Sequence, residues 1–215
     1  MKRIKQGLVM FVLIILNHNI NAQQSFGIKA GVQFSKMKEF VLNTNYLTSL
    51  QAKGIGVFKI NKSIALTPSI GYSGKGFVYR NLQMTDNLGN TIGTADAHNL
   101  FNYIQLTVPV SYSMGFGKAN TLFFGAGPYF AYALSGKGKL KNINGTVDPS
   151  SWALYSDDTY KRTDAGLVIE LSGTLNQRFL ISLNTDFGFT DVFKGEEAKM
   201  KTIAGGVSIG YLFQN

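Results

Sequence analysis

Residues 104–112 read Ile-Gln-Leu-Thr-Val-Pro-Val-Ser-Tyr, a stretch in which apolar and polar side chains alternate. The apolar positions are even-numbered: Ile104, Leu106, Val108, Val110 and Tyr112. The opposite face carries Gln105, Thr107 and Ser111. Because successive side chains of a β-strand point to opposite faces, this period of two predicts a strand with one apolar and one polar surface.

The same alternation recurs along the chain. It is clear in three further segments, at 26–34, 179–190 and 202–213, and looser in four others, at 49–60, 64–77, 121–135 and 161–175. The segment 49–60 fits least well, since Ile55 and Val57 fall on its polar face. Together the segments predict eight strands of roughly 10–14 residues, which is about the length that crosses a bilayer when a strand is tilted.

The predicted connections alternate in length. Short turns are expected near 61–63, 115–120 and 176–178, and long loops near 37–48, 79–99, 137–160 and 192–199. This alternation is typical of outer-membrane barrels, which have short periplasmic turns and longer extracellular loops. We therefore expect an all-β fold, an eight-stranded antiparallel up-and-down transmembrane β-barrel with periplasmic N- and C-termini. The alternative is a soluble lipid-binding barrel, in which the apolar faces would point inward.

Composition restricts the function classes. The chain has 215 residues with 15% charged residues, 13% aromatic residues, a formal net charge of +9 and a mean hydropathy of +0.03. It contains no cysteine, which excludes disulfide scaffolds, thiolate metal sites and cysteine nucleophiles. No motif calls for a cofactor or a metal, and we expect neither.

The N-terminal 22 residues have the pattern of a secretory signal peptide. Lys2, Arg3 and Lys5 precede the apolar run 7–16, and Ala22 supplies a small residue before the expected cleavage site. An uncleaved N-terminal anchor is the alternative reading, although the apolar run is short for a membrane-spanning helix. We expect residues 1–22 to be removed and residues 23–215 to form the barrel domain.

The polar faces of the strands are rich in glycine and carry charges. An eight-stranded barrel has an interior just wide enough for its own side chains, so these faces are expected inside. Six charged residues then point into the lumen: Lys29, Lys53, Lys75, Asp164, Glu170 and Asp186. Since buried charges persist only when paired, we expect a structural network of ion pairs and hydrogen bonds that fills the lumen. The functional alternative is a narrow pore for protons or cations.

Four segments resemble the PorT-like outer-membrane β-barrel family of Bacteroidota. They are 103–110 (Tyr-Ile-Gln-Leu-Thr-Val-Pro-Val), 124–130 (Phe-Gly-Ala-Gly-Pro-Tyr-Phe), 185–191 (Thr-Asp-Phe-Gly-Phe-Thr-Asp) and 207–213 (Val-Ser-Ile-Gly-Tyr-Leu-Phe). The resemblance implies an eight-stranded barrel inserted by the barrel-assembly machinery. An accessory role in type IX secretion, which the family's named member has, is an alternative function by fold-level analogy. The chain departs from the family at Gln105, where an acidic residue is frequent, and in having two residues after Phe213.

The remaining features favour a non-catalytic surface protein. The third long loop contains Lys137, Lys139 and Lys141 and ends near Lys161 and Arg162, a basic set that suits the phosphates of lipopolysaccharide. The alternative is that these charges are only solvated on the loop surface. The enzyme alternative is a lipid-modifying acyltransferase or hydrolase that uses His98, in the second long loop, with Asp86, Asp96, Ser73 or Ser135. We expect an integral outer-membrane monomer that contacts outer-membrane lipid and no nucleic acid.

Overall fold

The computed structural model describes residues 24–39, 44–86, 88–116, 119–147, 149–156, 159–195 and 199–213. Its strands are β1 (Gln24–Glu39), β2 (Asn45–Lys59), β3 (Ile64–Leu66), β4 (Ser69–Thr85), β5 (Thr91–Thr107), β6 (Val110–Phe116), β7 (Asn120–Gly145), β8 (Ser151–Ala153), β9 (Thr163–Leu175), β10 (Phe179–Gly188) and β11 (Met200–Phe213). Within these ranges no helix is long and apolar enough to cross a membrane. The expected signal peptide lies outside the described residues.

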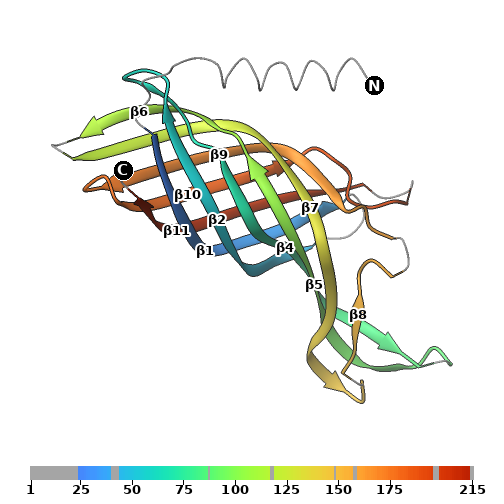
Figure 1. Cartoon of the computed structure of the whole chain (residues 1–215). Helices are drawn as coiled ribbons and strands as arrows, with labels where there is room; N and C mark the ends of the chain where they lie inside the picture. The colour runs from blue at the N-terminus through green and yellow to red at the C-terminus, as the bar shows by residue number, and fades with distance from the viewer. Residues whose placement is uncertain are drawn as a thin grey trace, which may run out of the picture.

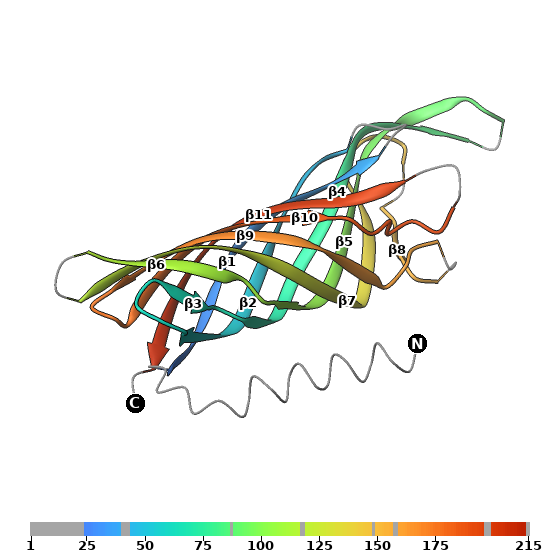
Figure 2. The ribbon, with the colours of Figure 1, turned by 90° about the horizontal axis from the view of Figure 1, so that it is seen from above.

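The strand pairings form a closed ring. Neighbours along the sheet are β1, β11, β10, β9, β7, β5, β4 and β2, and an additional pairing joins β2 to β1. All these pairings are antiparallel (Figures 1 and 2). A closed sheet leaves no unpaired edge, as a membrane-spanning barrel requires.

Two prolines explain why the described ranges contain eleven strands where the sequence predicts eight. The predicted strand at 64–77 is divided between β3 and β4 at Pro68, and the predicted strand at 104–112 is divided between β5 and β6 at Pro109. Proline lacks an amide hydrogen and interrupts a hydrogen-bonded ladder. The sheet remains hydrogen-bonded at both breaks. Thr67 N donates to Pro109 O at 3.0 Å, and Val108 N donates to Pro128 O at 3.0 Å. The eleventh strand, β8, pairs with β7 inside a predicted loop.

The two ends of the ring differ. At one end β1 begins beside the end of β11, with Phe26 opposite Phe213, and the connections 60–63, 117–119 and 176–178 are short. We call this the short-turn end and the opposite end the long-hairpin end. The predicted short turns at 61–63 and 176–178 are confirmed in position, and residues 117–118 of the turn predicted at 115–120 lie outside the described residues.

The predicted long loops 79–99 and 137–160 are wrong as loops. Strand β4 continues to Thr85, β5 begins at Thr91 and β7 runs to Gly145, so most of these residues extend the sheet. The described residues of 79–100 and 136–153, which leave out 87 and 148, form a β-extension that projects from the long-hairpin end (Figures 1 and 2). The reason is that β5 pairs with β4 and β7 almost throughout, with β-bulges that let the ladders continue.

The faces of the strands are divided as predicted. On β1 the exposed positions include Phe26, Ile28 and Phe34, whereas Lys29 and Gln33 are buried. The same division holds on β10, where Ile181 and Leu183 are exposed and Ser182 and Asn184 are buried. Apolar side chains therefore point outward and polar ones inward, which argues against the soluble lipid-binding alternative.

Candidate functional site

The six charged residues predicted to point inward are all buried. Lys29 lies on β1, Lys53 on β2, Lys75 on β4, Asp164 and Glu170 on β9, and Asp186 on β10. Each is at most 7% exposed. Removing a charge from water costs several kcal/mol unless partners compensate it, so the contacts of each charge decide what the cluster does.

Lys29 and Glu170 form the first ion pair. The Lys29 ammonium donates to both carboxylate oxygens of Glu170, at 2.7 and 2.8 Å, and it lies 3.4 Å from Ser182 Oγ. Ser172 Oγ donates to Glu170 Oε1 at 2.8 Å. Two opposite charges and two hydroxyl groups thus satisfy one another within the ring.

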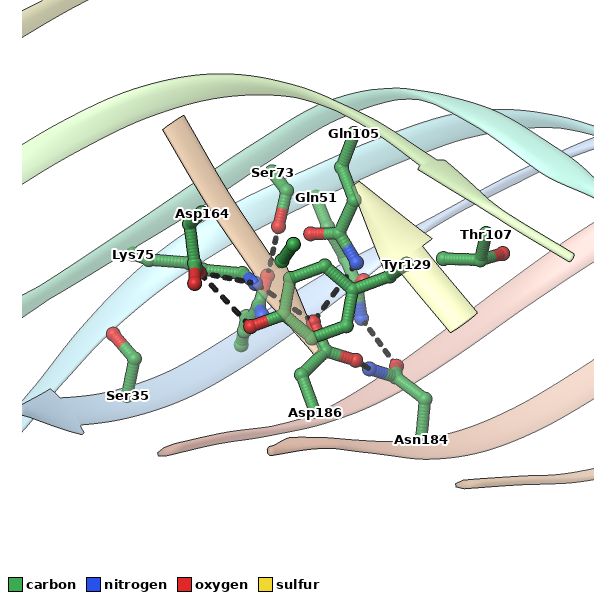
Figure 3. Close-up of polar contacts among 12 residues, drawn as sticks. Ser35, Gln51, Ser73, Lys75, Gln105, Thr107, Tyr129, Asp164, Asn184 and Asp186 are labelled. Atoms are coloured by element: carbon green, nitrogen blue, oxygen red, sulfur yellow. Dashed lines mark hydrogen bonds and ion pairs between the residues drawn. The ribbon is translucent and has the colours of Figure 1, made fainter. Parts of the chain in front are cut away.

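Lys75 lies between two carboxylates. Its ammonium nitrogen is 3.0 Å from Asp186 Oδ2 and 3.6 Å from Asp164 Oδ2, and it sits 4.1 Å from the centre of the Tyr129 ring (Figure 3). Tyr129 donates its hydroxyl hydrogen to Asp164 at 2.9 Å, and Gln105 Nε2 donates to Asp186 at 2.9 Å. Gln105 therefore serves as a donor to a carboxylate.

Lys53 differs from the other two lysines. It lies opposite Lys29 across the β1–β2 ladder, yet no carboxylate oxygen of the described residues is within 4.0 Å of its ammonium group. Its neighbour on the same face, Gln51, donates to Asn184 Oδ1 at 3.0 Å. The six predicted residues thus form one ion pair (Lys29 and Glu170) and one ion triad (Lys75, Asp164 and Asp186). Lys53 belongs to neither.

Two buried apolar clusters lie on either side of these charges, one toward each end of the ring. Toward the short-turn end, Ile55 follows Lys53 on the same face of β2 and packs in a buried cluster with Val57, Ala65, Phe123, Leu180 and Leu212. Toward the long-hairpin end, Phe77 follows Lys75 on β4 and belongs to a larger cluster that includes Met37, Phe101, Tyr103, Val168 and Met200. The positions of Ile55 and Val57, which weakened the strand prediction for 49–60, are explained by this apolar layer.

A β-bulge determines where the predicted basic loop lies. Asn102 is opposite Ser135 but Tyr103 is opposite Ala133, so β7 carries one extra residue, Leu134. Before the bulge the exposed positions of β7 are even-numbered, and beyond it Lys137, Lys139 and Lys141 are exposed. Without the extra residue these odd-numbered lysines would point into the ring. We call Lys137, Lys139 and Lys141 the lysine ladder.

The prediction that the five basic residues share a loop is therefore wrong. The ladder is part of strand β7, because β5 and β8 both pair with it. Lys161 and Arg162 precede β9 and are exposed. Arg162 Nη1 donates to the carbonyl oxygens of Ala133 and Leu134, at 3.1 and 3.3 Å, so its side chain holds the bulge.

A second basic group, which the sequence analysis did not single out, lies on β1 and β11. Lys36 and Lys38 follow Phe34 on the outward face of β1, and Lys201 lies directly opposite Lys38 on β11. Lys36 and Lys38 are even-numbered, like the outward apolar residues of β1. Lys201 is odd-numbered, like the outward apolar residues of β11. Extending the alternation of 26–34 by two more steps would have found them.

The serine and aspartate residues of the enzyme alternative hydrogen-bond to groups other than His98. His98 lies in β5, not in a loop, opposite Lys139. Ser73 Oγ donates to Gln33 at 2.8 Å, Ser135 Oγ accepts from Asn102 at 2.9 Å, and Asp86 accepts from amides of its own turn. Burial lowers the pKa of His98, and the nearby Lys141 lowers it further.

Asp96 has a structural position in the β-extension. Its carboxylate accepts from Asn142 Nδ2 at 2.7 Å and from Asn81 N at 2.9 Å, and these hydrogen bonds lower its pKa. Asn81 and Asn142 both have left-handed backbones, with φ of 54° and 49°, and each lies at a register shift. Asp96 thus holds two bulges, which explains its burial without a catalytic role.

Comparison with known proteins identifies one family and several similar solved structures. The family model described as outer membrane protein beta-barrel domain matches residues 19–194. Similar solved structures include the attachment invasion locus protein Ail of Yersinia pestis, 15% identical over 89% of this chain and 99% of that chain with a TM-score of 0.45. OprG from Pseudomonas aeruginosa is 13% identical over 90% of this chain and 98% of that chain, with a TM-score of 0.46. No curated protein matches the sequence significantly.

Proposed function

Since the chain belongs to the outer membrane protein beta-barrel domain family, we propose that it is a non-catalytic surface protein whose barrel is closed by its own side chains. It is an integral outer-membrane protein with an antiparallel barrel fold. In this proposal the chain crosses the membrane eight times, with both termini and the short-turn end in the periplasm and the β-extension outside the cell. The signal peptide directs export, and the barrel-assembly machinery inserts a monomer.

One observation is the main support for a closed lumen. The buried charges lie between two layers of apolar side chains, with Ile55 adjoining Lys53 on one side and Phe77 adjoining Lys75 on the other. A hydrated ion loses its water shell at great cost when it enters such a layer. The charges are therefore a means of holding strands together, and transport is not their role.

The outward surface supports an interaction role. The lysine ladder begins just beyond Leu134, the last apolar residue on the outward face of β7, at the level expected for lipid headgroups. Ammonium groups form charge-assisted hydrogen bonds with phosphate, so lipopolysaccharide is the partner that fits this position. The resemblance to PorT-like proteins of Bacteroidota favours a secretion partner as the alternative occupant.

Two experiments test the proposal. In planar bilayers the purified barrel is expected to give no single-channel conductance, and stepwise currents would contradict the closed lumen. For the surface, we compare binding of lipopolysaccharide to the wild type and to a Lys137→Ser/Lys139→Ser/Lys141→Ser variant, with Lys161→Ser as a second variant. Arg162 is left in place because it holds the bulge. Unchanged binding by the triple variant would refute the ladder as a lipopolysaccharide site.

A further inference from the structure

The basic group on β1 and β11 contains two lysines that face each other. Lys38 and Lys201 are directly opposite in the antiparallel ladder, and both side chains are exposed. Directly opposite residues have Cβ atoms about 4.5–5.5 Å apart, and like charges at such positions destabilise a strand pair. Among the carboxylates whose side chains the structure describes, a set that does not include Glu39, none lies within 4.0 Å of either ammonium group. An anion held between them would remove this repulsion.

Lys36 adds a third cation on the same surface. It lies two residues from Lys38 on the outward face of β1, and its ammonium nitrogen is 4.9 Å from the centre of the Tyr46 ring on β2. A cation held over an aromatic ring is attracted to the ring's electron-rich face, which restricts the lysine's position. Three positive charges thus lie on neighbouring strands, at one height along the barrel.

The height of this group indicates the source of the anion. Exposed apolar side chains occupy the outward face of β1 from Phe26 to Phe34, a span of nine residues, and this matches the 9–11 residues that a tilted strand needs to cross the hydrocarbon layer. Lys36 and Lys38 come next. On β11, which runs in the opposite direction, Lys201 lies on the long-hairpin side of the apolar positions Ile203 and Val207. The cations therefore lie where the hydrocarbon ends and the headgroups begin.

From this geometry we infer that Lys36, Lys38 and Lys201 form a second binding site for a phosphorylated glycolipid headgroup of the outer leaflet. The phosphate lies between Lys38 and Lys201, Lys36 donates to it from the side, and the acyl chains lie against Phe34 and Val207. The inference rests on the proposed orientation, in which the long-hairpin end faces outward. It adds a contact across the barrel from the lysine ladder, so the protein is held on two sides by lipids of one leaflet.

The test compares two lipids that differ only in phosphate. Folded protein in neutral detergent is titrated with bisphosphorylated lipid A and with chemically dephosphorylated lipid A, and bound lipid is counted by native mass spectrometry. We expect Lys38→Ser/Lys201→Ser to weaken binding of the bisphosphorylated form about a hundredfold, since the variant removes two charge-assisted contacts and each is worth roughly tenfold. Binding of the dephosphorylated form should not change. The matched control is Lys59→Ser/Lys62→Ser, which removes two charges at the short-turn end.

The outcomes separate this inference from the proposed function. Unchanged binding by Lys38→Ser/Lys201→Ser, with weakened binding by the lysine-ladder variant, overturns the second site and leaves the first. Unchanged binding by both variants overturns lipopolysaccharide as the partner altogether. An equal loss in the Lys59→Ser/Lys62→Ser control means that binding follows net charge, and it overturns the second site. A heat-dependent gel shift equal to that of the wild type verifies that each variant is folded.

Discussion

Arg162 donates from Nη1 to the carbonyl oxygen of Leu134, the extra residue of the β7 bulge, at 3.3 Å, and to that of Ala133 at 3.1 Å. Its guanidinium also lies 4.4 Å from the centre of the Tyr155 ring. A bulge leaves backbone groups without ladder partners, and here an arginine supplies the missing donors. This bulge determines that the side chains of the lysine ladder point outward. By holding the backbone of the bulge, Arg162 therefore positions the lysines on the surface.

Replacing Arg162 with methionine tests this role. We expect Arg162→Met to destabilise the barrel by about 1 kcal/mol, the usual value of a lost hydrogen bond at a partly exposed site. The chain has no cysteine, so Lys139→Cys offers a unique thiol. Its reaction with a charged, water-soluble thiol reagent should become severalfold slower in the Arg162→Met background. An unchanged rate would show that the bulge does not need Arg162; Lys161→Met is the control.

The hydrogen bond between Asn142 and Asp96 leads to a second prediction. Asn142→Gly keeps the left-handed backbone and removes only the hydrogen bond, whereas Asn142→Ala also forces a side chain into φ of 49°. We expect Asn142→Ala to destabilise the β-extension more than Asn142→Gly, by about 1 kcal/mol. Trp152, the only tryptophan, lies in β8 of the extension, so its fluorescence during urea titration reports this region. Equal losses would mean that the backbone conformation is unimportant.

Strand positions and faces could be predicted from the sequence because both follow from a period of two. The alternation of odd and even positions was alone sufficient to predict that four charged residues point inward: Lys29, Lys75, Glu170 and Asp186. Parity fails where a residue is added to a strand. On β7 the odd positions are inward at Ala131 and Ala133 but outward at Lys137, and no residue type around Leu134 reveals the change.

The β-extension was missed for a related reason. Residues 79–99 contain Arg80, Asn81, Asp86 and Asn90, polar residues that are typical of loops. Arg80 and Asn81 are nevertheless part of strand β4, because the Asp96 carboxylate accepts hydrogen bonds at two bulges, one on β4 and one on β7, which lie far apart in sequence. Such contacts depend on tertiary structure, so local propensity does not contain them.

His98 makes the stability of the β-extension dependent on pH. Burial and Lys141 lower its pKa in the folded protein, so the unfolded chain takes up a proton more readily. The contribution of His98 is therefore fully present above the unfolded pKa of about 6.5 and is lost as the pH falls through the lower folded value. We expect the urea midpoint reported by Trp152 to fall between pH 7 and pH 5 in the wild type. In His98→Gln this fall should be smaller; an identical pH profile would contradict the assignment.

Gly138 gives a fourth prediction, because the Trp152 indole covers it. A Cβ atom at this position would lie 2.0 Å from the nearest indole atom, whereas at Gly115 the nearest atom would be 3.9 Å away. Gly138→Ala must therefore displace the indole, and Gly115→Ala should leave it in place. We expect Gly138→Ala to shift the emission of Trp152 to longer wavelength as the ring enters water, while the heat-dependent gel shift of the barrel is retained. An unshifted spectrum would show that the ring does not pack on Gly138.

Lys75 offers the strongest test of the buried charges. Lys75→Met keeps the length of the side chain but leaves Asp164 and Asp186 without their common cation, at sites that are fully buried. Removing one partner of a buried ion pair costs about 3–5 kcal/mol, because the remaining charge is uncompensated. We expect a loss of this size in urea titrations followed by far-ultraviolet circular dichroism. Adding Asp186→Asn to Lys75→Met should restore part of the stability, since one uncompensated charge is then removed. If the double variant is less stable than Lys75→Met alone, the two residues do not act as a pair.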